Sequence, residues 1–215
     1  RCRRSGWEAG QMSVRAVVFD VGGVLERSVD PGWLAAKWQR LLGLDEIRFR
    51  SALRGVDPDR LIETGGLAED EYLRRYADAL GLTREQAAEW RRDMWDWYCG
   101  ELDIELTSYL ADLRPRLRTG ILSNSADGAR REEQARYGFE DLVDTIVYSH
   151  EIGVAKPDPR AYTLACQRLS VEPTETVFLD DTEAAVAGAR AVGMHAVLHV
   201  DTATSITDIN ALINP

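Results

Sequence analysis

The sequence has little positive charge, no long apolar run and few cysteines. Its 26 Lys and Arg residues are outnumbered by 36 Asp and Glu residues, which gives a formal net charge of −10 at pH 7. Proteins that bind nucleic acid need a basic surface, so we expect no nucleic-acid partner. No apolar stretch is long enough to cross a bilayer, so we expect no membrane partner either. The three cysteines lie far apart without the spacing of metal ligands, which is typical of a cytoplasmic protein in a reducing environment.

The remaining composition is that of an ordinary globular protein. Of the 215 residues, 45% are hydrophobic and 29% are charged, and no internal repeat or low-complexity segment is present. This length is enough to bury a sizeable core, either as one large domain or as a domain with a smaller second one. Segment 1–12 precedes the first apolar stretch, and we expect it to be an extension outside the fold. Composition indicates nothing about the oligomeric state.

The chain is organised around the segment VRAVVFDVGGVL at residues 14–25. Its apolar residues continue up to Asp20, as expected for a strand that is buried on both faces of a parallel sheet. Open α/β sheets bind ligands at the carboxyl ends of their strands, which is where Asp20 would lie. Gly22 and Gly23 follow and would let the backbone approach a ligand closely. A buried strand can also end in an Asp that caps a loop, so this segment needs support from the rest of the chain.

The rest of the chain divides into two regions of different pattern. Residues 27–103 show only helical spacing, and the first of these helices is expected to begin at Asp30. From residue 104 onward, short apolar runs alternate with helical segments up to a last helix that Thr204 would cap. This alternation predicts right-handed parallel units in a three-layer sandwich. We therefore predict an α/β core from residues 13–26 and 104–215, with an inserted all-helical cap from residues 27–103.

Polar side chains follow several of the expected strand ends and loops, namely Asp20, Ser123, Asn124, Lys156, Asp180 and Asp181. Each has an ordinary explanation by itself, as a helix cap or a solvated lysine, but a parallel sheet would bring them all to one edge. Clustered carboxylates repel one another unless a cation lies among them. Mg²⁺ suits such a cluster because it binds one or two carboxylates and keeps positions for water and a phosphate oxygen. Lys156 and Ser123 could bind the other phosphate oxygens, as phosphoryl transfer requires.

These segments resemble, in order and type, the haloacid dehalogenase-like (HAD) superfamily over residues 14–213. The four motifs are FDVGGVL at 19–25, ILSN at 121–124, VAKPD at 154–158 and FLDD at 178–181. The resemblance implies a Rossmann-like core with a parallel sheet. It also implies a four-helix cap of subclass I (C1) at the position of the helical insert. About 30 residues separate Ser123 from Lys156, too few for the alternative cap position.

The resemblance also implies a role for each residue of the motifs. Asp20 would be the nucleophile and a metal ligand, and the further metal ligands or neighbours would be the Gly22 carbonyl, Asp181 and Asp180. Ser123 and Lys156 would hold the phosphoryl group. Substrate contacts would come from Asn124, Gly22 and Gly23 and, in a cap loop that faces the active site in relatives, from Glu63 and Thr64.

One position departs from the pattern of the superfamily's phosphatases. These usually carry a second Asp two positions after the nucleophile, which protonates the leaving group and then activates water, whereas this chain has Gly22. A positioned general acid or base contributes roughly 10²–10⁴-fold in rate. Three accounts remain open: the leaving group needs little protonation, the cap or the substrate supplies the acid, or the protein is a poor phosphatase.

The function implied by the resemblance is a magnesium-dependent phosphatase that hydrolyses a small phosphorylated metabolite through an aspartyl-phosphate intermediate. The alternatives are a non-catalytic or regulatory protein with the same fold, and a hydrolase of the dehalogenase or phosphonatase type. A dehalogenase would lack the paired aspartates of the fourth motif. A phosphonatase would need a cap lysine for a Schiff base, and only Lys37 is available there. Asp180 and Asp181 therefore favour the phosphatase.

Overall fold

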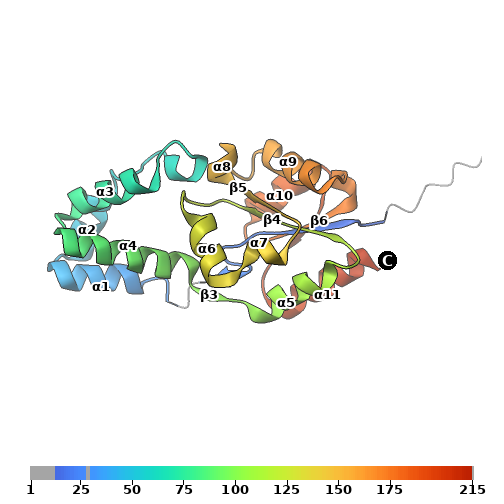
Figure 1. The fold of residues 1–215 in the computed structure, drawn as a ribbon, viewed down its shortest axis with the longest axis horizontal. Coiled ribbons are helices and arrows are strands. Elements are labelled where there is room, and N and C mark those ends of the chain that lie inside the picture. Colours follow the sequence, from blue (N-terminus) through green and yellow to red (C-terminus); the bar gives the residue numbers. More distant parts are fainter. Residues whose placement is uncertain (1–12, 28–29, 215) are drawn as a thin grey trace, which may run out of the picture.

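A computed structural model describes residues 13–27 and 30–214 (Figure 1). The segment 1–12, predicted to be an extension, lies outside these described residues. Helices α1 to α4 gather at one end of the molecule, and the main sheet with its flanking helices forms the other end (Figure 1). No helix within the described ranges is both long and apolar enough to cross a membrane.

The main sheet has five parallel strands in the order β5-β4-β1-β6-β7. In chain order these strands are β1 (Ala16–Phe19), β4 (Arg118–Ser123), β5 (Thr145–Tyr148), β6 (Thr176–Asp180) and β7 (His195–Leu198). The first strand of the chain thus lies in the middle of the sheet, with β4 on one side and β6 on the other. The predicted parallel α/β sheet is confirmed.

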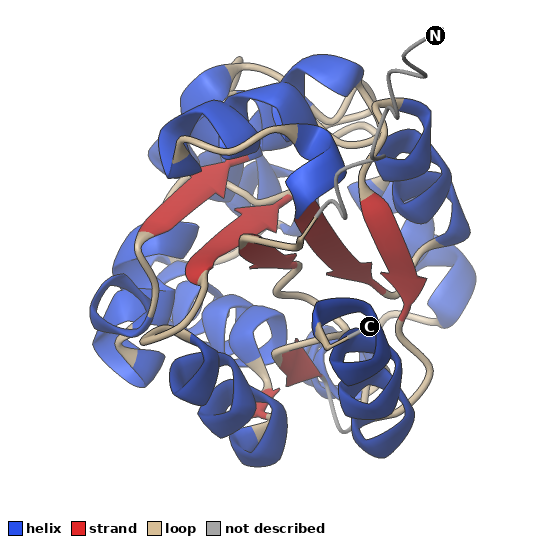
Figure 2. Ribbon diagram, turned by 90° about the vertical axis from the view of Figure 1, so that its right-hand side faces the viewer, coloured by secondary structure: helices blue, strands red, loops and turns tan. Residues whose placement is uncertain are grey.

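Helices cover both faces of this sheet (Figure 2). Val17 and Phe19 pack in the core that includes α5 (Ile104–Leu113), α7 (Phe139–Leu142) and α11 (Thr202–Ile213). Ala16 and Val18 point the other way, into the core formed with α9 (Pro159–Leu169) and α10 (Glu183–Ala191). All four residues of β1 are fully buried. Burial on both faces explains why the apolar run at residues 16–19 is uninterrupted, since no position in it faces water.

The inserted helices have a core of their own. They are α1 (Trp33–Leu42), α2 (Glu46–Leu53), α3 (Glu69–Leu80) and α4 (Arg84–Cys99), with the short 3₁₀ helix η1 (Leu61–Thr64) between α2 and α3. Trp38 and Trp90 meet edge to face, with their ring centroids 5.2 Å apart. The Trp38 Nε1–H donates to the Asp93 carboxylate at 2.8 Å, which satisfies the polar end of a fully buried indole. The aromatic residues of this segment therefore serve mainly as packing.

The structure differs from the sequence-based expectation at three places, two at the insert and one at the last helix. Short strands β2 (Glu26–Arg27) and β3 (Glu101–Leu102) pair antiparallel next to the insert, where only helix was expected. Helix α1 has Gly32 as its N-cap rather than Asp30, whose carboxylate accepts a hydrogen bond from the Gly32 amide at 3.0 Å. The last helix begins at Thr202, because the Asp201 carboxylate, not Thr204, caps its free amides.

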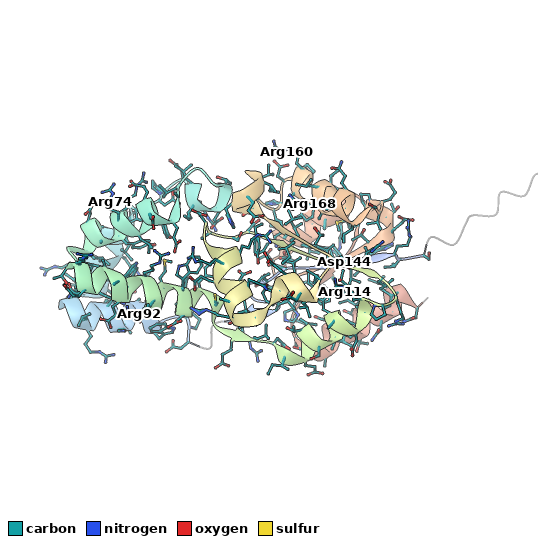
Figure 3. All side chains as sticks on the ribbon, in the orientation of Figure 1. Arg74, Arg92, Arg114, Asp144, Arg160 and Arg168 are labelled. Carbon is teal, nitrogen blue, oxygen red and sulfur yellow. The ribbon has the colours of Figure 1, made fainter. Side chains whose placement is uncertain are left out.

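Three further helices complete this part of the chain, together with the loop that carries Lys156. They are α6 (Ala129–Tyr137), α8 (Ser149–Ile152) and the 3₁₀ helix η2 (Pro173–Glu175). Charged side chains project from the outside of the molecule, such as Arg74 and Arg160 (Figure 3). Some of them fix loops: Arg114, at the end of α5, pairs at 3.2 Å with Asp144, which precedes β5.

Candidate active site

The register of the sheet brings three of the predicted strand ends to one level. Phe19 pairs with Ile121 on one side and with Leu179 on the other. Asp20 therefore emerges beside Leu122 and Asp180, and Ser123 and Asp181 follow one residue later. All of them lie at the carboxyl edge of the parallel sheet, where α/β folds place their ligands.

Lys156 connects two of these carboxylates. Its Nζ lies 2.7 Å from Asp20 Oδ1 and 2.6 Å from Asp180 Oδ2. All three residues are buried, with 7% of Lys156, 7% of Asp20 and none of Asp180 exposed. A buried charge without a partner is very costly, and here the Lys156 ammonium group partners both carboxylates, which offsets the cost of burying them. Burial raises the pKa of Asp20 to about 6, and the charge of Lys156 opposes that rise.

Asn124 fixes the loop that carries Lys156. Its Oδ1 accepts a hydrogen bond from the Lys156 amide at 2.8 Å, and its Nδ2 donates to the Lys156 carbonyl at 2.9 Å. A side-chain amide that bonds both backbone groups of one residue acts like a neighbouring strand. Asn124 was expected to line the site, and this contact gives it a positioning role toward Lys156 as well.

Thr182 performs a similar function for Asp180. The second carboxylate oxygen of Asp180 accepts hydrogen bonds from the Thr182 amide at 2.8 Å and from its hydroxyl at 2.6 Å. Both oxygens of Asp180 are therefore occupied, one by Lys156 and one by Thr182. Sequence reasoning missed Thr182, although its place directly after the Asp pair and before a helix is a recognisable capping signal.

Three carboxylates of the site could hold a divalent cation. Asp20, Asp180 and Asp181 each offer one oxygen, and these oxygens all lie within 4.8 Å of one another. A hard cation such as Mg²⁺ prefers oxygen ligands, and it would remove the repulsion among three like charges. The chemistry of this donor set therefore fits Mg²⁺.

The two glycines after Asp20 differ in how much room they have. Gly23 has a φ of +80°, and a Cβ built there would lie 2.3 Å from Asp181 Oδ2. Any side chain at position 23 would displace that carboxylate, so glycine is required. A Cβ at Gly22 would meet no atom within 4 Å, so this position has open space.

The two predicted cap residues, Glu63 and Thr64, lie on a helix that contacts the core. Helix η1, which carries Glu63 and Thr64, packs against α8 of the core, and a Cβ on the following Gly65 would come within 2.3 Å of the His150 carbonyl oxygen. Glu63 lines a cavity that also reaches Asn124, whereas Thr64 is not among the residues that line it. The Glu63 carboxylate accepts a hydrogen bond from Arg60 Nε at 2.9 Å.

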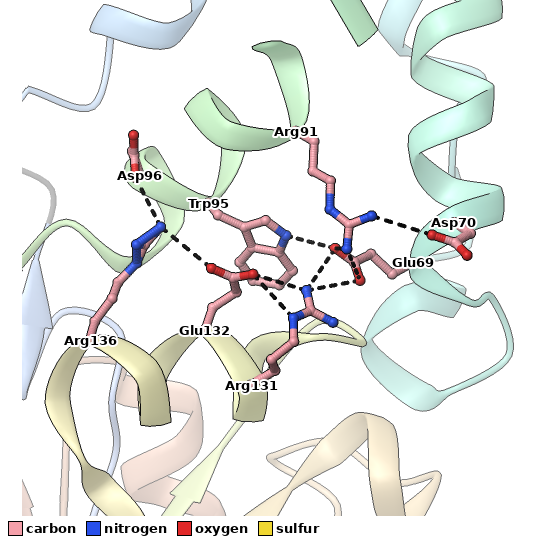
Figure 4. Close-up of polar contacts among 8 residues, drawn as sticks. All are labelled: Glu69, Asp70, Arg91, Trp95, Asp96, Arg131, Glu132 and Arg136. Atoms are coloured by element: carbon pink, nitrogen blue, oxygen red, sulfur yellow. Dashed lines mark hydrogen bonds and ion pairs between the residues drawn. The ribbon is translucent and has the colours of Figure 1, made fainter. Parts of the chain in front are cut away.

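Ion pairs and hydrogen bonds join the cap to the core beside this cavity (Figure 4). Glu69 of the cap accepts from Trp95 Nε1 at 2.7 Å and pairs with Arg91 at 2.9 Å, both within the cap. From the core, Arg131 reaches the same carboxylate at 3.0 Å, and Asp127 accepts from the Glu69 amide at 2.9 Å. We call this group the Glu69 cluster. It holds the first turn of α3 against the core.

Two buried carboxyl groups were not foreseen from the sequence. Glu26 is 2% exposed and Glu133 is fully buried, and each has one carboxyl oxygen without a hydrogen-bond partner among the described residues. Tyr148 donates its hydroxyl to the other oxygen of Glu133. Burial and, to a lesser degree, the charge of Asp20 raise the pKa of Glu133 to about 8, although the hydrogen bond from Tyr148 opposes this rise. Burial and the charge of Glu133 raise the pKa of Glu26 to about 10. Both groups are therefore mostly neutral at pH 7.

The comparison with protein families agrees with this fold and site. The family model described as haloacid dehalogenase-like hydrolase matches residues 14–193, which is most of the chain. The chain therefore belongs to the haloacid dehalogenase-like hydrolases, and the resemblance drawn from its four motifs is confirmed. It is a hydrolase of the phosphatase-like kind.

Similar proteins of known sequence include several phosphatases. Phosphatase MT3486 of Mycobacterium tuberculosis is 37% identical over 198 residues, which cover 87% of this chain and 88% of that protein. D-ribitol-5-phosphate phosphatase of Bacteroides thetaiotaomicron is 26% identical over 174 residues, which cover 78% of this chain and 83% of that protein.

Solved structures show the same fold. The HAD family enzyme bt-2542 of Bacteroides thetaiotaomicron superposes with a TM-score of 0.76 at 20% identity, over 87% of this chain and 94% of that one. The same enzyme in complex with magnesium and inorganic phosphate superposes with a TM-score of 0.73 at 20% identity, over 87% of this chain and 95% of that one.

Proposed function

We propose that this chain is a magnesium-dependent phosphatase that hydrolyses a small phosphorylated metabolite through an aspartyl-phosphate intermediate. The observation that carries the proposal is the position of Lys156 Nζ, within 2.7 Å of both Asp20 and Asp180, at a sheet edge where Asp181 adds a third carboxylate. The phosphatases among its relatives, and the relative solved with magnesium and inorganic phosphate, support this assignment.

The metal would be held by Asp20, Asp181 and the Gly22 carbonyl, with Asp180 as a further ligand or neighbour. When bound, Mg²⁺ supplies positive charge to the phosphoryl oxygens and to the carboxylates. Lys156 adds a second positive charge, 2.7 Å from Asp20 Oδ1. Ser123, the last residue of β4 and 2% exposed, would donate a hydrogen bond to a phosphoryl oxygen.

In the first step, an Asp20 carboxylate oxygen would attack phosphorus while the bond from phosphorus to the leaving oxygen breaks. The leaving oxygen would take its proton from water or from the substrate itself, because Gly22 has no acidic side chain. In the second step, a water oxygen would attack phosphorus while the bond from phosphorus to the Asp20 oxygen breaks. The water would give up one proton to the departing phosphate or to solvent, inorganic phosphate would leave, and the Asp20 carboxylate would be regenerated. Both steps need the nucleophile in line with the leaving group, and a buried Asp20 held by Lys156 is suited to that.

We further propose that residues 27–103 act as a cap over a core formed by residues 13–26 and 104–215. The Glu69 cluster and the packing of η1 on α8 would hold the closed form, which excludes water from the reaction. Cys99 and Cys166 are free thiols, which supports a protein of the reducing cytoplasm.

The test is phosphate release from a panel of phosphate esters and acyl phosphates, with Mg²⁺ or with a chelator, for the native chain and for Asp20→Asn. Asn has the shape of Asp but cannot act as the nucleophile. We expect release that needs both Mg²⁺ and Asp20. A folded protein that binds Mg²⁺ but hydrolyses nothing on the panel would refute the phosphatase, as would equal activity in Asp20→Asn.

A further inference from the structure

A cavity of about 420 Å³ lies where the cap meets the core. This volume is in the range of sites that bind small molecules. Most of its walls come from cap helices, and the core closes it with Asn124 and Ala126. On the core side the cavity reaches Asn124, whose side chain bonds the backbone of Lys156, the residue proposed to bind phosphate.

The walls of the cavity are mainly aromatic and aliphatic. The rings include Phe49, Tyr76, Trp90, Trp95 and Tyr98, and the aliphatic residues include Leu34. Trp95 is fixed by its hydrogen bond to Glu69 in the cluster of Figure 4, so this wall is positioned before any ligand arrives. Removing an apolar ligand group from water into such a cavity is favourable in proportion to the area buried.

The charges around the cavity exclude an anionic ligand group. Among the described residues that line it there is no Lys, Arg or His, and the one charged residue there, Glu63, is already paired with Arg60. A carboxylate or a second phosphate would lose its hydration there without gaining a positive partner, which is costly. A cationic group would find the Glu63 charge largely neutralised by Arg60.

One polar group in the lining has no partner. The indole N–H of Trp90 is buried and donates no hydrogen bond within the described residues, and Trp90 as a whole is 3% exposed. The hydroxyls of Tyr72 and Tyr76 share one hydrogen bond at 3.0 Å, so one of their two O–H groups remains free to donate. The polar groups of the lining are few and scattered, whereas most of its residues are apolar.

We propose that this cavity binds the organic part of the substrate and selects an uncharged, largely apolar group, either aliphatic or aromatic. The proposal rests on the proposed function, because it places that group next to a phosphoryl group at Lys156. The substrate class is then the phosphate monoester of an apolar alcohol. Sugar phosphates, with many hydroxyls, and phosphorylated carboxylic acids are disfavoured.

The test is the binding of phosphonates, which mimic the ester but are not hydrolysed, measured by calorimetry in the presence of Mg²⁺. The series is methyl-, butyl- and hexylphosphonate, with 6-phosphonohexanoate as the anionic counterpart of equal chain length. We expect each added methylene to tighten binding by roughly two- to fourfold. The terminal carboxylate should cancel most of this gain. An affinity that does not depend on chain length, or equal binding of the carboxylate, would overturn the proposal.

A matched pair of variants locates the binding. Ala35 lines the cavity, whereas its neighbour Ala36 on α1 is exposed and does not. Ala35→Phe should fill the cavity and weaken hexylphosphonate at least about tenfold, with methylphosphonate unchanged, and Ala36→Phe should change neither. Loss of both ligands, or of neither, in a folded Ala35→Phe protein would contradict the assignment. If this variant does not fold, the chain-length series with the native protein decides alone.

Hydrolysis of acetyl phosphate separates this proposal from the proposed function. Acetyl phosphate has almost no organic part, so its Mg²⁺-dependent hydrolysis tests the phosphatase alone. Hydrolysis together with a flat phosphonate series would refute the apolar cavity and leave the phosphatase intact. Tighter binding of longer phosphonates without any hydrolysis would refute the phosphatase and leave the apolar cavity intact.

Discussion

Replacing Gly22 with Asp would place a carboxylate two positions after Asp20, where phosphatases of this superfamily usually carry their general acid and base. The structure has room for it. A Cβ at position 22 meets no atom within 4 Å, and Gly22 is not among the glycines with positive φ. We therefore expect Gly22→Asp to fold like the native chain.

The expected gain depends on the leaving group. A positioned general acid contributes roughly 10²–10⁴-fold where a poor leaving group must be protonated. The kcat for an alkyl phosphate, which expels an alkoxide, should therefore rise by about 10²-fold or more in Gly22→Asp. Acetyl phosphate expels a stable carboxylate and should gain little.

The assay is the ratio of kcat for hexyl phosphate to kcat for acetyl phosphate, measured at saturating Mg²⁺. Gly22→Asn is the matched control, because its side chain has the same shape without the acid. The ratio should rise in Gly22→Asp and stay near the native value in Gly22→Asn. An equal ratio in the two folded variants, both of which bind Mg²⁺, would refute the reasoning about position 22.

Three further predictions follow from contacts elsewhere in the structure. Gly23→Ala should weaken Mg²⁺ binding, measured by calorimetry, because its Cβ would push the Asp181 carboxylate away; unchanged affinity would contradict the close approach. Burial raises the pKa of Glu133 from 4.5 to about 8, so this group binds its proton more tightly in the folded chain than in the unfolded one. The free energy of unfolding should therefore fall as the pH rises from 4.5 to 8, by about 1.4 kcal/mol per pH unit. Urea unfolding at pH 5.5 and 7.5 should show a smaller pH effect in Glu133→Gln, and an equal effect would exclude this carboxyl group. Arg131→Met removes the ion pair between the core and Glu69. The free energy that holds the cap closed should fall by about 1 kcal/mol, and amide hydrogen exchange at the start of α3 should become about fivefold faster. Unchanged exchange would show that this pair does not hold the cap.

Much of the core could be predicted from the sequence because its signals are local. The apolar run at residues 16–19 has no polar interruption, as a strand buried on both faces requires, and the structure buries all four residues. Asp20, Asp180 and Asp181 could be identified because they stand at strand ends, and parallel strands bring their carboxyl ends to one edge. Lys156 stands in the loop after α8 and could be identified by its place in the VAKPD motif.

Other features could not be predicted because they depend on contacts between distant segments. Glu133 lies in the polar stretch RREEQARY, and nothing in that stretch indicates that one of its two glutamates is fully buried. Glu69 is the first residue of α3, yet its side-chain partners lie 22 to 62 positions away in Arg91, Trp95 and Arg131. Strands β2 and β3 span two residues each, which is too short for any periodicity.

The cap also shows why the substrate class could not be predicted from the sequence. Its helices can be read from spacing and capping residues, and several of its aromatic residues pack in a core. Several of them also line the cavity beside Asn124, and a sequence pattern cannot distinguish a ring that faces a core from one that faces a cavity. The chemical class of the substrate therefore becomes accessible only with the structure.

The most direct test of the central claim is to look for phosphate on Asp20 itself. The protein would be mixed with a substrate from the panel and Mg²⁺, quenched in acid within the first turnovers, and analysed by mass spectrometry of its peptides. We predict a phosphorylated peptide that contains Asp20, and no such peptide with a chelator or in Asp20→Asn. Phosphate release without any adduct on Asp20, or an adduct on another residue, would contradict the account.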